Sequence, residues 1–323
     1  MSLLPKISNT CFNDLHELES SDYKWDLPFK KISIGNFHGS TASIDLGVVQ
    51  MVEARLSGTL LQNGLTPPGY KTFAIPAIDS RAFWWHYRKV DHNHLLVFPE
   101  NRKFKCISYD GFHVYTLSIQ EQYLKTLCDT YGFTRVTGKL RGKEKVLPIA
   151  KPNIYLLNSM LQTLSLAIKL KGEEDFPEGL ISTTREELCK KVLQLVEESD
   201  ETENVPIKRD RDRTVLKALE YILDHDLQKI SIEELVVKTG IKKRALEYAF
   251  QEYATVSPKR FIQALRLNNF REDIKQNMDQ ISDTAIRHGF THHGQLARDY
   301  KLLFAEMPRD TLKRAMKNEE SDI

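Results

Sequence analysis

The last third of this chain contains the same short pattern twice, and this doubling is the feature that most constrains the fold. A short amphipathic helix ends at Gly240 and a second helix follows at once; the same order recurs around Gly289. Glycine adopts the left-handed backbone of a tight turn without steric cost. Two helices joined by such a turn form a helix-turn-helix pattern. The sequence therefore predicts two helix-turn-helix units in an all-helical region.

The first unit begins with a capping box, in which Ser231 is followed three residues later by Glu234. In the second helix of this unit the apolar side chains form one stripe: Leu246, Ala249, Phe250 and Tyr253. The outward side carries long polar side chains suited to a major groove: Lys243, Arg244, Glu247, Tyr248 and Gln251. Taken alone, this side is most simply a solvated helix surface.

The second unit repeats this layout after an amphipathic helix in SPKRFIQALRLNNFREDIKQ. Its second helix has an apolar side formed by Leu296, Tyr300, Leu303 and Phe304. Its polar side is formed by His292, His293, Gln295, Arg298 and Lys301. A connecting helix of about 16 residues spans roughly 24 Å. With its flanking turns it can hold two reading helices about one DNA turn, near 34 Å, apart. The repeated arrangement indicates DNA binding.

Composition and charge divide the chain in two. The stretch EESDETENVPIKRDRDR is almost wholly polar and changes from acidic to basic. It predicts a solvated linker at residues 197–212, between an N-terminal domain (1–196) and a DNA-binding domain (213–317). Residues 208–317 hold 22 Lys+Arg and 16 Asp+Glu, an excess that fits a polyanionic partner.

The N-terminal part changes from β to helical patterning near Ser118. Short β-branched and aromatic runs separated by turn signals predict a sandwich or barrel, followed by about three helices. In RAFWWHYRKV, one strand would place Phe83, Trp85 and Tyr87 on a common face. The predicted class is α+β, with a β-barrel and trailing helices before the all-α domain.

Residues 213 to 316 resemble the DNA-binding domain of AraC-type transcription regulators. The resemblance lies in SIEELVVKTGIKKRALEYAF, VSPKRFIQALRL, ISDTAIRHGF and YKLLFAEMPRDTLKR, and most specifically in GFTHHGQLARDYKLLFAEMP. LLVFPENRKFKCISYDGFHVYTLSI is similar to the cupin-like sensory barrels that precede such domains. The resemblance implies a sequence-specific transcription regulator, and we expect an activator that works with RNA polymerase on double-stranded DNA.

The resemblance also implies roles for single residues. The base readers would be Arg244, Glu247, Tyr248, His293, Gln295 and Arg298. The phosphate contacts would be Lys243, Lys259, Arg260 and Lys301. Three positions depart from the family pattern. Glu247 puts an acid on the reading face, where it either accepts from cytosine N4 or is a helix-surface charge. The other two departures concern the ends of the reading helices. Lys242 and Lys243 replace the usual Ser-Pro start, and Ala305 stands where the family has Gly.

For the N-terminal domain the resemblance implies an effector or a dimer contact. The equivalent dimer helix would be Asn153 to Leu170, although its own barrel is the favoured partner of its apolar stripe. An apolar or aromatic effector would suit Phe83, Trp85 and Tyr87, but a role in the core is the simpler interpretation.

We expect a cytoplasmic protein with no membrane partner. No apolar run approaches the roughly 18 residues of a membrane span, and no secretory signal is visible. The four cysteines are scattered, with no CxxC pair, which suits a reducing compartment.

The alternative interpretation is a metal-binding cupin enzyme fused to a DNA-binding domain. His92 and His94 share a strand face, but four apolar residues follow and Glu100 comes after a proline. A repair protein with a methyl-accepting cysteine would need a partner set around Cys106 or Cys128, and none is apparent. We therefore expect no enzymatic activity, no cofactor and no metal.

Overall fold

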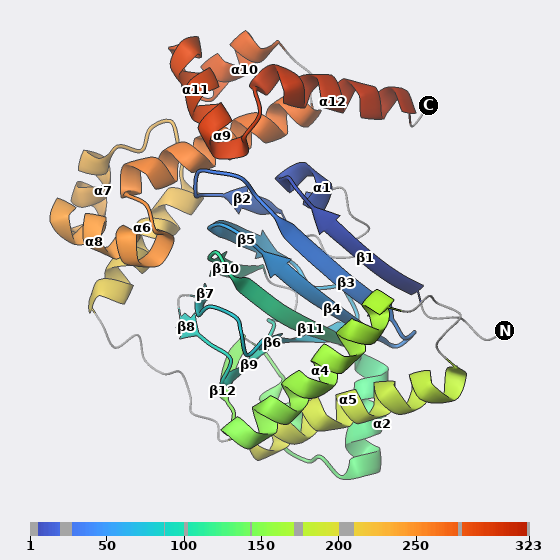
Figure 1. Ribbon diagram of the computed structural model, residues 1–323. Coiled ribbons are helices and arrows are strands. Elements are labelled where there is room, and N and C mark those ends of the chain that lie inside the picture. The colour runs from blue at the N-terminus through green and yellow to red at the C-terminus, as the bar shows by residue number, and fades with distance from the viewer. Residues whose placement is uncertain are drawn as a thin grey trace. The chain divides into compact units, whose positions relative to one another are not determined.

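The computed structural model describes residues 6–19, 28–86, 88–99, 103–142, 144–170, 177–199, 210–276 and 280–321 (Figure 1). The chain divides into two compact units. The first unit comprises Met1–Pro28, His38–Ser57 and Gln62–Pro206, and the second comprises Phe29–Phe37, Gly58–Leu61 and Ile207–Ile323. The linker at residues 197–212 stays a prediction, because residues 200–209 lie outside the described part.

Two β-sheets are formed by the N-terminal half. The seven-stranded sheet has the order β1-β3-β4-β11-β6-β9-β12, and the five-stranded sheet has the order β2-β5-β10-β7-β8. The strands are β1 Lys6–Phe12, β2 Phe29–Lys31, β3 Gly39–Asp45, β4 Val49–Leu56, β5 Leu60–Gly64, β6 Tyr70–Pro76, β7 Phe83–Trp85, β8 Arg88–Val90, β9 His94–Val97, β10 Phe104–Ser108, β11 Phe112–Gln120 and β12 Lys145–Pro148.

The α+β class is confirmed, with a correction to the predicted β-barrel. Within the described strands the two sheets are separate and each keeps two edges, whereas a barrel would pair its terminal strands. The single strand expected across RAFWWHYRKV also reverses. His86 has a φ of 41°, and Trp85 pairs with Arg88 in a tight hairpin of β7 and β8.

Three helices cover one face of the seven-stranded sheet (Figure 1). They are α2 Glu121–Tyr131, α4 Lys151–Leu170 and α5 Glu178–Glu198, with the short α1 Leu15–Glu19 and α3 Val136–Lys139 beside them. The predicted helices after the β part are therefore confirmed. The apolar stripe of α4 is buried in the core of its own unit: Ile154, Leu157, Leu161, Leu164 and Ile168.

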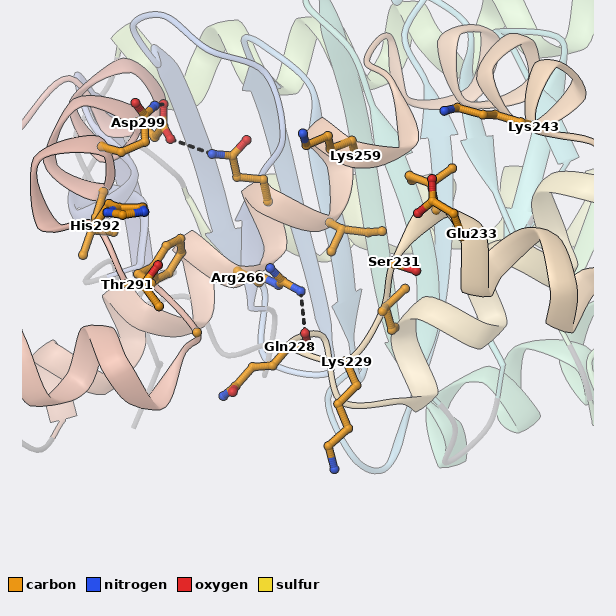
Figure 2. Close-up of a pocket in the computed structure, with 18 residues that line it drawn as sticks. Gln228, Lys229, Ser231, Glu233, Lys243, Lys259, Arg266, Thr291, His292 and Asp299 are labelled. Carbon is orange, nitrogen blue, oxygen red and sulfur yellow. Dashed lines mark hydrogen bonds between the residues drawn. The ribbon is translucent and has the colours of Figure 1, made fainter.

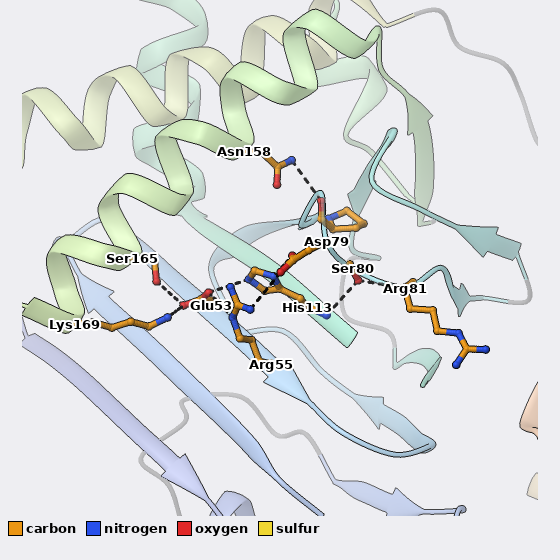
Figure 3. A network of polar contacts seen from close by, with 10 residues as sticks. Glu53, Arg55, Asp79, Ser80, Arg81, His113, Asn158, Ser165 and Lys169 are labelled. Atoms are coloured by element: carbon orange, nitrogen blue, oxygen red, sulfur yellow. Dashed lines mark hydrogen bonds and ion pairs between the residues drawn. The ribbon is translucent and has the colours of Figure 1, made fainter. Parts of the chain in front are cut away.

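A buried charged network ties α4 to this sheet (Figure 3). The carboxylate of Glu53 on β4 is 2.9 Å from Nε2 of His113 on β11 and also accepts from Ser165 and Lys169 of α4. The other ring nitrogen of His113 contacts Asp79. Burial alone would raise the pKa of Glu53, but these hydrogen bonds outweigh it and hold the pKa well below its ordinary value.

The second unit contains seven helices in its described part. They are α6 Asp210–Asp224, α7 Ile232–Thr239, α8 Lys243–Ala254, α9 Pro258–Gln276, α10 Ile281–Arg287, α11 His293–Phe304 and α12 Pro308–Ser321. Ser231 caps α7 by accepting from the Glu234 N–H at 3.0 Å, and Gly240 follows it with a φ of 70°. Gly289 follows α10 with a φ of 75°. Both predicted helix-turn-helix units are present. None of the helices in the described part of the chain is both long and apolar enough to cross a membrane.

Candidate nucleic-acid interface

The second helices of the two units, α8 and α11, present their polar sides to solvent. All ten side chains predicted to face DNA are exposed: Lys243, Arg244, Glu247, Tyr248, Lys259, Arg260, His293, Gln295, Arg298 and Lys301. The apolar residues of the same helices are buried, including Leu246 and Phe250 on α8 and Leu296 and Tyr300 on α11. The amphipathic pattern therefore predicts correctly which side chains of α8 and α11 are exposed and which are buried.

Two pairs of contacts hold candidate readers in place. On α8, Nη2 of Arg244 donates to the Tyr248 hydroxyl at 3.2 Å, and the guanidinium carbon lies 5.5 Å from the Tyr248 ring centroid. On α11, Nε2 of Gln295 donates to Asp299 at 2.8 Å, and the same carboxylate accepts from Gln263 of α9 at 2.6 Å. Asp299 therefore links a candidate reader to the connecting helix.

The two units repeat at one offset, since Lys243 opens α8 and His293 opens α11 fifty residues later. Each reading helix ends at a residue in the left-handed region, Thr255 with a φ of 60° and Ala305 with a φ of 61°. Ala305 thus takes the conformation that favours glycine. With this offset of fifty residues, Tyr248 on α8 and Arg298 on α11 lie at equivalent positions of their helices.

A groove of about 750 Å³ lies between the first turns of the reading helices (Figure 2). Its lining includes the cations Lys229, Lys243, Lys259 and Arg266, together with His292 and the acids Glu233 and Asp299. Arg266 on α9 donates from Nε to the carbonyl of Leu227 at 2.7 Å and from Nη2 to that of Gln228 at 2.9 Å. Burial lowers the pKa of this guanidinium, and Asp226 partly opposes the shift.

The helix N-termini beside the groove add partial positive charge. Lys242 and His292 stand at the N-cap positions of α8 and α11, and neither side chain caps its helix. The first backbone N–H groups of a helix point outward and attract anions. The groove can therefore bind phosphate through backbone amides as well as through lysine side chains.

Sequence reasoning missed part of this groove. Lys229 and Arg266 lie in a turn and on the connecting helix, and they carry no motif of their own. The signal that could have found Arg266 is its place on α9. It lies seven residues, or about two turns, beyond Lys259, and therefore on the same side of the helix.

Of the three residues predicted to contact an effector, the structure describes two, Phe83 and Trp85. Phe83 and Trp85 are buried, and Trp85 packs against Phe98 at 4.5 Å and Phe104 at 5.2 Å between ring centroids. Tyr87 lies outside the described residues.

The residues of the metal-enzyme alternative do not come together. His94 is 2.8 Å from the carboxylate of Asp91, and the ring of His92 lies 6.4 Å from that of Tyr155. Glu100 lies outside the described residues. Within the residues that the structure covers, no group of three or more His, Cys, Asp or Glu side chains is arranged to hold a metal.

The cysteines of the repair alternative lie in apolar surroundings. Cys106 and Cys128 are both buried, and burial raises the pKa of each thiol above its ordinary value. A raised pKa disfavours the thiolate that methyl transfer needs.

Comparison with known proteins identifies the C-terminal unit. Residues 235–314 match the family model described as a helix-turn-helix domain. The XylDLEGF operon transcriptional activator 3 of Pseudomonas putida is 32% identical over 101 residues, which are 30% of this chain and 30% of that protein. The HTH-type transcriptional activator RhaS of Escherichia coli O139:H28 is 25% identical over 158 residues, which are 49% of this chain and 55% of that protein.

These matches cover only part of the relatives: the chain spans about 30% of the length of the first of them. Among solved structures, the AraC-like transcriptional activator CuxR has a TM-score of 0.43 at 10% identity, over 82% of this chain and 96% of that one. ToxT from Vibrio cholerae O395 has a TM-score of 0.30 at 9% identity, over 96% of this chain and 97% of that one.

Proposed function

We propose that this chain, whose C-terminal unit is a helix-turn-helix domain of the AraC/XylS type, is a sequence-specific DNA-binding transcription regulator. The observation that carries the proposal is the arrangement around α9. This helix of 19 residues, about 28 Å long, joins two units that each expose a polar reading helix. That length suits the spacing of two successive major grooves on one side of a duplex.

The groove between the reading helices supports the same proposal. When α8 and α11 enter neighbouring major grooves, the sugar-phosphate backbone between them must cross the connecting helix. Lys259 and Arg266 lie on that side of α9, and Lys243 and Lys229 lie nearby. We assign phosphate binding to this groove, and base reading to Arg244, Glu247, Tyr248, His293, Gln295 and Arg298.

Selection of binding sites from a random double-stranded DNA pool tests the proposal. The full-length protein at near-physiological salt should enrich a bipartite motif whose two elements lie about one helical turn apart. Enrichment of one element would mean that a single unit reads DNA. The absence of any enrichment, with residues 208–323 also failing, would refute the proposal.

We also propose that the regulator is an activator that contacts RNA polymerase in the cytoplasm and forms a dimer through α4. The side of α4 that points away from its own core carries three exposed leucines, Leu156 51%, Leu166 56% and Leu170 75% exposed, with the small polar residues Ser159 and Thr163 between them. Such a side favours association with a second copy. Leu166→Glu should shift the sedimentation coefficient towards that of a monomer, whereas Leu180→Glu on the neighbouring α5 should not. A wild-type chain that is monomeric at every concentration would contradict the dimer.

We propose that the N-terminal unit senses a small effector. The indole N–H of Trp85 is buried without a hydrogen-bond partner among the described residues, and buried indoles ordinarily find one. An effector with an acceptor group beside an aromatic or apolar body would satisfy it. Metabolite screening by thermal shift, repeated with Trp85→Phe, tests this: a metabolite that stabilises both proteins equally does not use the indole N–H.

A further inference from the structure

Two short segments from the N-terminal half, Phe29–Phe37 and Gly58–Leu61, belong to the compact unit that contains the reading helices. We propose that residues 29–37 with Thr59 form a brace that fixes the position of α8 relative to α11, with Asn268 of α9 as its central positioning residue. The inference rests on the proposed function and specifies how the two reading helices are held at one DNA spacing.

The centre of the brace is a two-way hydrogen bond between Asn268 and β2. Oδ1 of Asn268 accepts from the Lys31 N–H at 2.9 Å, and Nδ2 donates to the Lys31 carbonyl at 2.8 Å. The side-chain amide thereby makes the two hydrogen bonds to β2 that the backbone of a neighbouring strand would make. Asn268 is buried, with 4% exposure. Lys30 adds a contact to the next residue of α9, with Nζ 2.8 Å from Oδ1 of Asn269. The connecting helix is therefore attached to a segment that precedes it by more than 200 residues.

The brace also reaches the last turn of the second reading helix. The ammonium group of Lys31 donates to the carbonyl of Leu303, and the Gly35 N–H donates to the carbonyl of Leu302 at 3.1 Å. These carbonyls belong to the end of α11, where no partner within the helix is available. Lys31 is 2% exposed, so its donors are directed to backbone oxygens and away from water.

The first reading helix is held through Thr59. Its hydroxyl lies 2.9 Å from the hydroxyl of Thr255, the residue that ends α8. Thr59 is itself attached to the rest of the brace, because its carbonyl accepts from the Ile32 N–H at 2.9 Å and its N–H donates to Ser33 at 2.8 Å. A continuous set of hydrogen bonds thus joins the ends of both reading helices to the middle of α9.

The brace lies on the side of α9 away from the groove. Lys259 and Arg266 line the groove, whereas Asn268 follows Arg266 by two residues and therefore lies about 200° around the helix. Because it is on the opposite side, the segment leaves the groove open. The brace therefore fixes the position of α8 relative to α11 and does not cover the sides of these helices that would face DNA.

The test uses the full-length protein and DNA duplexes that carry both selected elements at centre-to-centre separations from about 8 to about 13 base pairs. Asn268→Ala removes the hydrogen bonds between α9 and the backbone of Lys31. Lys31→Met removes the ammonium group that donates to the carbonyl of Leu303. Gln194→Ala on α5, which removes an exposed amide that donates to Glu198 at 2.7 Å, is the matched control in the first unit. Dissociation constants are measured for every duplex and for a duplex with one element alone.

We expect the wild type and the control to prefer one separation sharply. Both brace variants should bind that duplex about tenfold more weakly, because a reader that is no longer held in place loses preorganisation. Their preference among separations should flatten, whereas binding to the single element should stay unchanged.

Two outcomes would overturn the brace while leaving DNA binding intact. One is an unchanged separation profile in both variants. The other is an equal loss on the single element and on all bipartite duplexes, which would mean only that the fold is weakened. If the wild type binds none of the duplexes, the proposed function itself fails. Thr59→Val, which removes a hydroxyl with little change in volume, decides the question if the other variants do not fold.

Discussion

Replacing Glu53 with glutamine should destabilise the first unit strongly, although the side chains have nearly the same shape. The Glu53 carboxylate is 3% exposed and accepts hydrogen bonds from His113, Ser165 and Lys169. Removing one partner of a buried ion pair costs about 3–5 kcal/mol. We expect the lower end, about 3 kcal/mol, because the Lys169 side chain is 30% exposed and regains some hydration. For a unit of this size, that loss lowers the melting temperature by about 6–12 °C.

The effect should depend on pH in a definite direction. The pKa of folded Glu53 lies below its ordinary value, so its contribution to stability is complete above the unfolded pKa of about 4.3 and is lost as the pH falls. The difference in unfolding free energy between wild type and Glu53→Gln should therefore be constant from neutral pH to about pH 5 and shrink below that.

Tryptophan fluorescence is a suitable assay, because Trp84 and Trp85 are buried in the first unit. Glu187→Gln is the matched control, since that side chain is 54% exposed and pairs only loosely with Lys190 at 3.7 Å. The control should change the unfolding free energy by less than about 0.5 kcal/mol. Equal melting temperatures for the two variants would refute the argument that α4 is held by a buried charge.

Three further predictions concern the DNA-binding unit and its stability. Arg298→Ala should weaken binding to the best site by about 1–3 kcal/mol and relax the preference at one base pair; equal weakening on every sequence would instead make Arg298 a phosphate contact. Lys259→Ala should weaken binding evenly and reduce the slope of log K against log salt by about 1; an unchanged slope would remove Lys259 from the phosphate-binding groove. Ala305→Gly should raise the unfolding free energy by about 0.5–1 kcal/mol, because residue 305 has a φ of 61°; a loss of stability in denaturant titrations would show that the methyl group contributes more than the backbone strain costs.

The helix-turn-helix units could be predicted because their signals are local. Ser231 caps the helix that begins at the next residue, and Gly240 and Gly289 make their turns within two residues of the helix they follow. The amphipathic period then separates Leu246 and Leu296 from the exposed readers. Each of these features depends on residues at most four positions apart, which is the range over which a single sequence is informative.

The β part was less predictable because sheet closure depends on distant residues. An alternating run such as RAFWWHYRKV has the pattern of one strand, but the left-handed φ of His86 turns it into a hairpin. Whether the two end strands of the larger sheet, β1 and β12, pair with each other depends on segments that lie more than 130 positions apart in the chain. No local sequence pattern predicts such a pairing.

The contacts of the brace could not be predicted from the sequence either, because they join residues even farther apart in the chain. Lys31 and Asn268 are residue types that usually lie at the surface, and both are buried because their polar groups find partners more than 200 positions away. The Asn268 amide pairs with the backbone of Lys31, and the Lys31 ammonium group donates to the carbonyl of Leu303. A burial that depends on a pair is invisible when either residue is considered alone. The exposed side chains expected to touch DNA could therefore be predicted from the sequence, whereas the side chains of the proposed brace could not.

Truncation at the domain boundary predicted from the sequence would remove Lys31 and Thr59 from the unit that they stabilise. Residues 208–323 alone should therefore bind a single DNA element normally and discriminate poorly between duplexes with different separations of the two elements.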